Sequence, residues 1–210
     1  MADPSSGGVP GMSSSDRGDE SSCKVSVKPM ARGSAADELH AVWWHRLAEG
    51  NSDAQLQTLI EIGRSTRVLG VSDLVTRLAG SRDDSVRAAA AQALEHALQP
   101  SLVELPALIV SLSDHSDGEI SYWAATLLGR LGKKAVDAVP ALCDCLTSSS
   151  FLAARERAVW ALQEIGPGAS ESIPVLRAAS ESAPARLQQL CRDAISAIGK
   201  GDCLHTKQVA

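Results

Sequence analysis

The sequence predicts an all-α fold, a right-handed α-solenoid of about five helical hairpins. One observation is a fixed period, because Pro106, Pro140 and Pro174 recur every 34 residues in similar surroundings. Such a period is typical of repeat arrays, in which each unit buries its apolar face only against its neighbours. The other observation is composition. Aromatic residues make up only 3% of the chain and the apolar set is mostly alanine and leucine, which favours helices over strands.

The chain divides into three parts. Residues 1–37 hold nine serines, five glycines and three prolines. They show no helical period and bury too little apolar surface to offset the entropy of ordering, so we expect a disordered tail. A regulatory phosphorylation role for this tail is an alternative. Residues 38–200 form the repeat domain, and residues 201–210 form a short C-terminal tail.

The first hairpin begins at Glu38. Its first helix carries Leu39, Val42, Trp43 and Leu47 at helical spacing. Ser52 or Asp53 is expected to cap the second helix, which is expected to end at Gly63. The pair Trp43-Trp44 is expected to cover the exposed end of the array, with a docking site there as the alternative.

Four further two-helix units follow. Their first helices are expected to start near Ser72, Val103, Val136 and Glu171, and short polar turns precede the second helices. The second helices are expected at 86–98, 120–131, 154–165 and 187–198. The five units then span 38–66, 67–101, 102–135, 136–169 and 170–200.

Proline and glycine mark the helix ends. In the first turn of a helix, proline loses no hydrogen bond, because its missing N–H has no partner there. The three repeated prolines are therefore entry marks for first helices. Gly132, Gly166 and Gly199 recur near the ends of second helices, where glycine is the usual stop signal.

The second helices carry a family resemblance. They read Ser85-Val-Arg-Ala-Ala-Ala-Ala-Gln-Ala-Leu and Arg157-Ala-Val-Trp-Ala-Leu-Gln-Glu-Ile-Gly, and Asp83 and Asp84 precede the first of them. A 34-residue period also belongs to tetratricopeptide repeats, but those need aromatic residues at set places and this chain has one Tyr and one Phe. The pattern over residues 52–200 resembles HEAT repeats, specifically the short phycobilisome-lyase-type form. That resemblance implies an armadillo-like helical scaffold.

The composition excludes several classes. With 20 Lys+Arg against 25 Asp+Glu, the chain lacks the basic stripe of a nucleic-acid binder. No stretch approaches the roughly 18 apolar residues of a membrane span, and the start does not read as a secretory signal. Five scattered cysteines do not form a disulfide framework. We therefore expect a cytoplasmic protein, a monomer, that binds neither nucleic acid nor membrane.

No catalytic or metal motif emerges. The five histidines do not recur with the repeat, and no His-Glu pair of the kind used by HEAT-like di-iron hydroxylases occurs. Asp114-His-Ser-Asp-Gly118 fails as a calcium loop because Ala125 stands where the bidentate Glu is required. Cys143 and Cys145 are expected to be small core or boundary residues, with metal or redox chemistry as the alternative. We expect no metal, no cofactor and no enzyme activity.

A binding surface is expected on the concave face, which second helices line in this family. The outward stripe of these helices carries the candidate partner-binding residues Tyr122, Thr126, Arg130, Glu156, Trp160 and Glu164. Trp, Tyr and Arg are enriched at binding hot spots. The alternative is that Trp160 and Trp123 fill gaps left by alanines between repeats. Arg87 and Arg155, two periods apart, are expected to form an inter-repeat ladder with turn aspartates, with ligand binding as the alternative.

The sequence thus predicts a non-catalytic scaffold or adaptor that holds a protein partner on its concave face. The resemblance leaves one alternative open, a lyase-like or chaperone-like subunit acting on a cofactor-bearing client protein.

Overall fold

The structure, a computed structural model, describes residues 35–65, 70–96, 99–114 and 116–205. The chain separates into two compact units, Met1–Ala31 and Arg32–Ala210, and all described helices belong to the second. The expected N-terminal tail lies outside the described residues except for 35–37, which are already helical. Of the expected C-terminal tail, residues 201–205 continue the last helix and the rest is likewise outside the described part.

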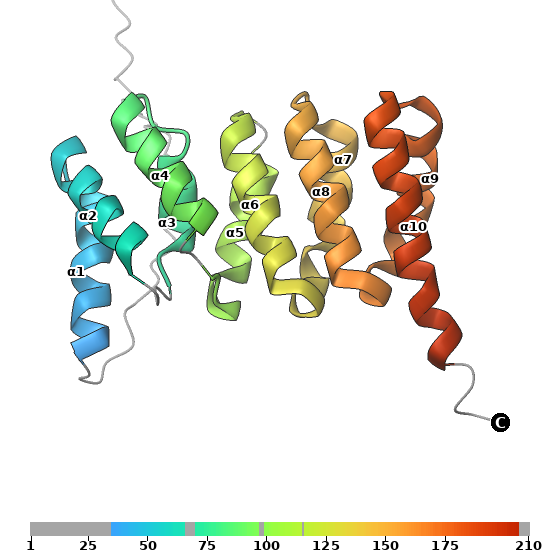
Figure 1. Ribbon diagram of the computed structural model, residues 1–210, viewed down its shortest axis with the longest axis horizontal. Coiled ribbons are helices and arrows are strands. Elements are labelled where there is room, and N and C mark those ends of the chain that lie inside the picture. Colours follow the sequence, from blue (N-terminus) through green and yellow to red (C-terminus); the bar gives the residue numbers. More distant parts are fainter. Residues whose placement is uncertain (1–34, 66–69, 97–98, 115, 206–210) are drawn as a thin grey trace, which may run out of the picture. The chain divides into compact units, whose positions relative to one another are not determined.

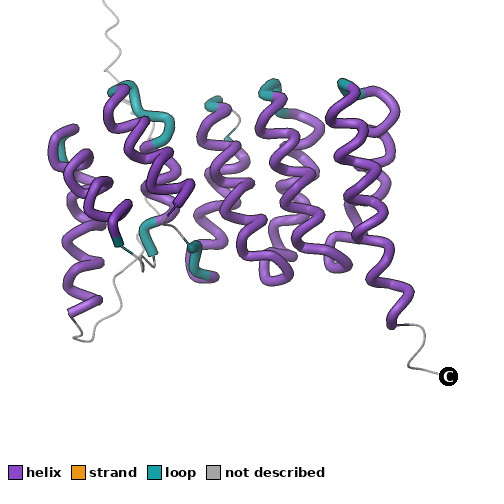
Figure 2. The backbone as a smooth tube through the Cα atoms, viewed as in Figure 1, coloured by secondary structure: helices purple, strands orange, loops and turns teal. Residues whose placement is uncertain are grey.

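The described residues form five helical hairpins that stand side by side (Figures 1 and 2). No strand occurs among them, which confirms the all-α solenoid. The ten α-helices are α1 (Ala35–Glu49), α2 (Ser52–Arg64), α3 (Ser72–Leu78), α4 (Asp84–His96), α5 (Leu105–Ser113), α6 (Gly118–Leu131), α7 (Val139–Ser148), α8 (Leu152–Ile165), α9 (Ile173–Ser182) and α10 (Ala185–His205).

The hairpins build two layers. The second helices α2, α4, α6, α8 and α10 lie nearer the viewer in Figure 1, and α3, α5, α7 and α9 lie behind their partners. We call the outer surface of the second helices the second-helix face. Between the layers runs a continuous apolar core, in which Leu59, Leu94, Leu108, Leu128 and Leu162 are among the fully buried side chains. Each hairpin buries its apolar side against the next, as expected of a repeat array.

The expected entry and exit marks are confirmed in the regular part of the array. The three repeated prolines lie in the first turns of α5, α7 and α9. Each of these helices follows a short 3₁₀ segment: Leu102–Glu104, Gly132–Ala138 and Gly166–Ser172. Gly132 and Gly166 end α6 and α8 with positive φ values of 55° and 71°, a conformation that glycine adopts without a Cβ clash.

The expected marks are wrong at three other places. Gly199 lies inside α10, and Gly63 lies inside α2, which ends at Arg64. The cap of α2 is Asn51, whose side chain accepts a hydrogen bond from the Ala54 amide at 2.9 Å.

At the first end of the array, Trp43 is buried and donates from its indole nitrogen to Glu61 at 3.0 Å, whereas Trp44 is exposed. Only Trp43 therefore covers the core there.

The junction between the second and third hairpins is less regular than the others. Helix α3 has only seven residues and packs on both α5 and α6, while the described backbones of α4 and α6 pack much less closely than those of α6 and α8. In contrast, α6 and α8 pack along their length. The array is thus densest from α6 to α10.

Candidate binding groove on the second-helix face

Two adjoining pockets lie on the second-helix face between α6, α8 and α10. The first has a volume of about 410 Å³ and the second about 210 Å³. The first is lined by Ser116, Asp117, Gly118, Glu119, Tyr122, Phe151 and Ala153. The second is lined by Tyr122, Ala153, Glu156, Arg157, Trp160, Arg186 and Leu190. Because Tyr122 and Ala153 line both, the pockets form one continuous feature, which we call the α6–α8–α10 groove.

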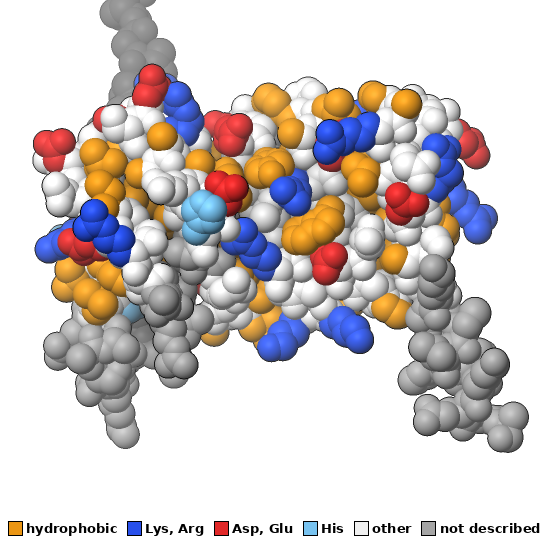
Figure 3. Space-filling view, viewed as in Figure 1, with side chains coloured by type: hydrophobic (Ala, Val, Ile, Leu, Met, Phe, Trp, Pro, Cys, Tyr) orange, Lys and Arg blue, Asp and Glu red, His pale blue; other side chains and the backbone are white. Residues whose placement is uncertain are grey.

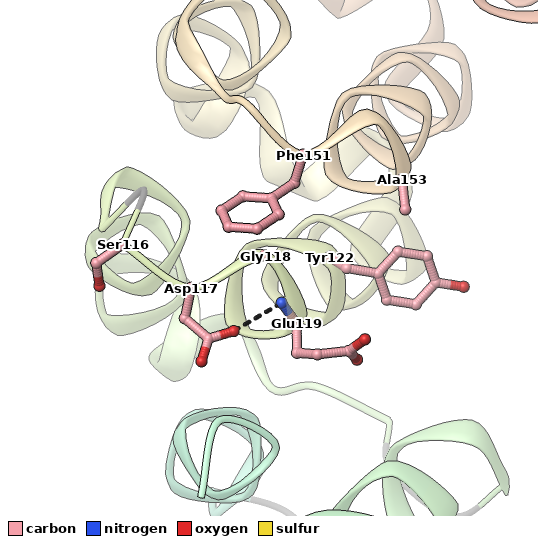
Figure 4. A pocket seen from close by; sticks show the side chains of 7 residues that line it. All are labelled: Ser116, Asp117, Gly118, Glu119, Tyr122, Phe151 and Ala153. Carbon is pink, nitrogen blue, oxygen red and sulfur yellow. Dashed lines mark hydrogen bonds between the residues drawn. The ribbon is translucent and has the colours of Figure 1, made fainter. Parts of the chain in front are cut away.

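The first pocket has two aromatic walls, made by the only Phe and the only Tyr of the chain. Phe151 precedes α8, and its ring packs directly on Gly118, where any Cβ would clash with it. Phe151 is nevertheless 39% exposed. Figure 4 shows Phe151 and Tyr122 on two sides of the pocket, with the Glu119 and Asp117 carboxylates near its rim.

Three side chains join the first pocket to the second. The guanidinium of Arg157 lies 4.9 Å from the ring centre of Tyr122 and 5.1 Å from that of Trp160. Its Nη2 also donates to the Tyr122 hydroxyl at 2.7 Å. On its other side, Tyr122 packs edge-on against buried Trp123, with ring centres 5.1 Å apart. These contacts hold Tyr122, Arg157 and Trp160 in one fixed arrangement.

Charged groups surround this aromatic cluster. Asp117 caps α6, since its Oδ1 accepts from the amides of Glu119 at 2.8 Å and Ile120 at 3.4 Å. Glu119 is exposed and forms no ion pair among the described residues. At the opposite end, Arg186 pairs with Glu156 at 3.2 Å. The groove is therefore acidic at the α6 end and of mixed charge at the α10 end.

Trp160 lies half-buried over α6. Its ring packs on Gly129, where a Cβ would overlap the ring atoms. Trp160 thus packs between repeats, but it does so over a glycine rather than over the alanines that the sequence-based alternative named. One side of the same ring lines the second pocket, so packing and exposure occur together in this residue.

Three expected site residues lie outside the groove. Thr126 is only 4% exposed, and its hydroxyl donates to the carbonyl of Tyr122 at 2.8 Å. Arg130 donates to the carbonyls of Leu94 and Glu95, the latter at 3.1 Å, so it caps the C-terminus of α4. Glu164 is exposed near the far end of α8. The expected outward stripe thus contributes Tyr122, Glu156 and Trp160 to the groove and not the other three.

The expected arginine ladder is wrong in its connectivity. Arg87 donates to the carbonyl of Ser81 at 2.8 Å and pairs with Asp84. Arg155 donates to the carbonyl of Leu146 at 2.8 Å. Each bond stays within one hairpin, so both arginines tie a second helix to the segment before it and do not link repeats.

Sequence reasoning missed the residues that complete the groove. Arg157 could have been found, because it stands three residues before Trp160 and therefore on the same side of the helix. Phe151 and Glu119 are harder to find, because they meet only when α6 and α8 pack. Arg186 and Leu190 join from α10, whose register against α8 the sequence does not show.

The described residues offer little for metal or redox chemistry. Nowhere in the described ranges do three His, Cys, Asp or Glu side chains gather as metal ligands would. Burial raises the pKa of the Cys145 thiol to about 11 and also raises the pKa values of Cys143 and Cys191, which disfavours the reactive thiolate. None of the described helices combines the length and apolarity that crossing a bilayer requires.

The second-helix face as a whole carries both signs of charge. Figure 3, seen from the same direction as Figure 1, shows hydrophobic side chains among basic and acidic ones over α6 and α8. The groove therefore lies in a mixed surface, typical of an interface rim around an aromatic centre.

Comparisons with known proteins identify the repeat. Residues 105–196 match the family model of HEAT repeats. Among solved structures, the chain is similar to a designed armadillo repeat protein in complex with the peptide (KR)4. The two chains are 14% identical, with a TM-score of 0.53 over 76% of this chain and 81% of the other. No curated protein matches the chain.

Proposed function

Since residues 105–196 match the family model of HEAT repeats, we propose that this chain is a non-catalytic interaction module that holds a segment of a partner protein in the α6–α8–α10 groove. One observation carries the proposal: Tyr122, Arg157 and Trp160 form a fixed, partly exposed cluster between two adjoining pockets. Tyr, Trp and Arg are the residues that most often dominate binding energy. Because packing and hydrogen bonds already hold these side chains, little entropy is lost when a partner covers them.

The shape of the groove suits an extended segment. The two pockets occupy successive grooves between neighbouring second helices, whose axes pack roughly 8–10 Å apart. A segment in the extended polyproline II conformation advances about 3.1 Å per residue with three residues per turn, so side chains three residues apart lie on one face and would reach both pockets. The designed armadillo repeat protein of similar fold is itself in complex with a peptide, which supports this mode of binding.

The finer features stay predictions from the sequence. They are the concave shape of the second-helix face, the cytoplasmic location, the monomeric state and the lack of a cofactor. Among the described residues, no contact favours the lyase-like or chaperone-like alternative.

Ala153 provides the direct test, because it is exposed and lines both pockets. The Ala153→Arg variant would place a long side chain in the groove without touching the core. Its matched control is Ala178→Arg, an exposed alanine on α9 in the other layer. The full-length wild type and both variants would be used to capture partners by cross-linking, with mass spectrometry of the linked peptides.

We expect cross-links from the wild type and from Ala178→Arg to map to the groove, and expect Ala153→Arg to lose them while its unfolding curve stays unchanged. The proposal is wrong if Ala153→Arg captures the same proteins as the control, or if the cross-links map to another surface.

A further inference from the structure

We infer that the first pocket accepts a cationic side chain, Arg or Lys, of the bound segment. This inference rests on the proposed function and adds the chemistry of the partner to it. The pocket combines two aromatic walls, Phe151 and Tyr122, with the carboxylates of Asp117 and Glu119 at its rim (Figure 4). Aromatic faces and carboxylates both favour a cation, and they do so here within one pocket of about 410 Å³.

The aromatic walls are fixed before any ligand arrives. Phe151 packs on Gly118, and Tyr122 is held by its hydrogen bond from Arg157 and its edge-on contact with Trp123. A cation in the pocket would therefore meet aromatic side chains that need no rearrangement. Arg157 already demonstrates the interaction in this chain, because its guanidinium lies over the Tyr122 and Trp160 rings.

The start of α6 does not offer the pocket to an anion. A helix N-terminus normally attracts anions through its free amides. Here the carboxylate of Asp117 already accepts from the amides of Glu119 and Ile120. The Glu119 carboxylate is exposed beside them and would repel a second anion. The local charge thus favours a cation.

The second pocket calls for a different side chain. Arg157 and Arg186 line it and would repel a second cation, whereas Trp160 and Leu190 offer apolar surface. We therefore expect a segment with a basic residue and an apolar residue about three positions apart, on one face of a polyproline II conformation. The net charge of −5 would also speed the approach of a basic partner.

Peptide titration of the full-length chain tests this inference. The probes are blocked Gly-Ser peptides that carry Arg and Leu about three positions apart, with matched peptides in which Glu or Ser replaces Arg. Binding would be followed by tryptophan fluorescence, since Trp160 lines the groove, and by calorimetry at low and high salt. The variants are Glu119→Gln, Phe151→Leu and the control Glu181→Gln, an exposed carboxylate on α9.

We expect the Arg peptide to bind, the Ser peptide to bind more weakly and the Glu peptide not to bind. Glu119→Gln should weaken binding of the Arg peptide about fivefold to tenfold at low salt and less at high salt. Phe151→Leu should weaken it at both salt concentrations, and Glu181→Gln should bind as the wild type does.

Equal loss of affinity in Glu119→Gln and Glu181→Gln would overturn the inference, because it would indicate only general attraction to an acidic chain. Preference for the Glu peptide would overturn it as well. The two proposals fail separately. If cross-linked partner segments map to the groove but are acidic there, the proposed function is supported and the inference of a cation pocket is wrong. If Ala153→Arg captures partners as the wild type does, the proposed function itself is wrong.

Discussion

Glu104 is the side chain that links the second hairpin to the third. It is 6% exposed, and its carboxylate accepts hydrogen bonds from the amides of Ser72, Gly70 and Ser101. Ser101 also caps the 3₁₀ segment, because its hydroxyl accepts from the Val103 amide. One carboxylate thus satisfies the start of α3 and the start of its own 3₁₀ segment, across the least regular junction of the array.

Replacing Glu104 with alanine should therefore lower the free energy of unfolding by about 2 kcal/mol. The reason is that buried amides of two hairpins lose their acceptor, which costs more than the mean hydrogen bond. Urea denaturation of the full chain measures the change. Glu181→Ala on the exposed side of α9 is the control and should stay within about 0.5 kcal/mol of the wild type. Equal effects of the two substitutions would contradict the prediction.

Glu104 should also make stability depend on pH. Burial raises the pKa of this carboxyl above its ordinary value of 4.5, and the nearby charge of Asp73 adds to the rise, although hydrogen bonds from Ser101 and Ser72 oppose it. An acid with a higher pKa in the folded chain holds its proton more tightly there, so protonation favours folding. The contribution of Glu104 to unfolding free energy should therefore fall as pH rises above 4.5, until the folded-state pKa is passed.

The difference in unfolding free energy between the wild type and Glu104→Gln isolates this effect from other titrating groups. It should be most favourable to the wild type in acid and should decline to a plateau toward neutral pH. A difference that grows with pH would show that the hydrogen bonds outweigh burial and that the folded-state pKa is lowered.

At the residue scale, the sequence periodicity predicted the side of the helix on which a residue lies better than it predicted how deeply the residue is buried. Thr126 and Trp160 occupy the same place in successive repeats. Thr126 is nevertheless buried, while Trp160 is partly exposed. The difference arises because Trp160 lies over Gly129 in the turn of α6 that follows Thr126. How a side chain is covered depends on the neighbouring helix, which a single-helix pattern does not contain.

At the scale of helices, the contact between α6 and α8 depends on Gly129. Helix propensity alone would favour alanine at this position, but packing requires glycine. Gly129 is buried inside α6, and a Cβ there would overlap the Trp160 ring. Gly63, inside α2, has no atom within 4 Å of the corresponding Cβ position. Alanine is favoured over glycine in a helix by about 1 kcal/mol, so the two sites differ only in packing.

Gly129→Ala should therefore destabilise the chain by about 1–3 kcal/mol through overpacking, whereas Gly63→Ala should stabilise it by about 0.5–1 kcal/mol. Thermal and urea unfolding measure both. The double variant Gly129→Ala/Trp160→Ala should lose less than the sum of its parts, because the clash disappears with the ring. Equal stabilisation by both glycine substitutions would disprove the contact.

The glycines that the sequence predicted as helix ends also differ in backbone conformation. Gly166 ends α8 with φ of 71°, while Gly199 lies inside α10. We expect Gly166→Ala to destabilise the chain by about 1–2 kcal/mol and Gly199→Ala to stabilise it by about 0.5–1 kcal/mol. The test is urea unfolding of both variants, and destabilisation by Gly199→Ala would contradict a continuous α10.

These prolines and glycines show which helix ends could be predicted from the sequence. The repeated prolines, with Gly132 and Gly166, defined the ends of the helices they touch, because each has a local mechanical reason to stand there. Gly199 follows Gly166 by 33 residues without the same role, because α10 continues through it to His205. Spacing is informative only where the next unit requires a turn.

At the scale of the molecule, the array is uneven along its length. The α6–α8–α10 part packs closely, while the described backbones of α4 and α6 pack less closely. The junction instead relies on α3, on the bonds to Glu104 and on Arg130, which donates to the last carbonyls of α4. In a repeat array, stability is approximately a sum of unit terms and interface terms, so a weak interface divides the cooperative unit.

Hydrogen exchange should consequently show two levels of protection. We expect the core amides of α6 and α8 to exchange only through the largest opening, and those of α2 and α4 to exchange through a smaller one at lower urea concentration. Arg130→Ala removes the contact to the end of α4 and should widen this difference by lowering the protection of α4 while leaving that of α8 nearly unchanged. Because the groove lies wholly within the better-packed part, peptide binding should raise protection in α6, α8 and α10 only. Uniform protection along the array, or equal loss in α4 and α8 on substitution of Arg130, would show that the hairpins unfold as a single unit.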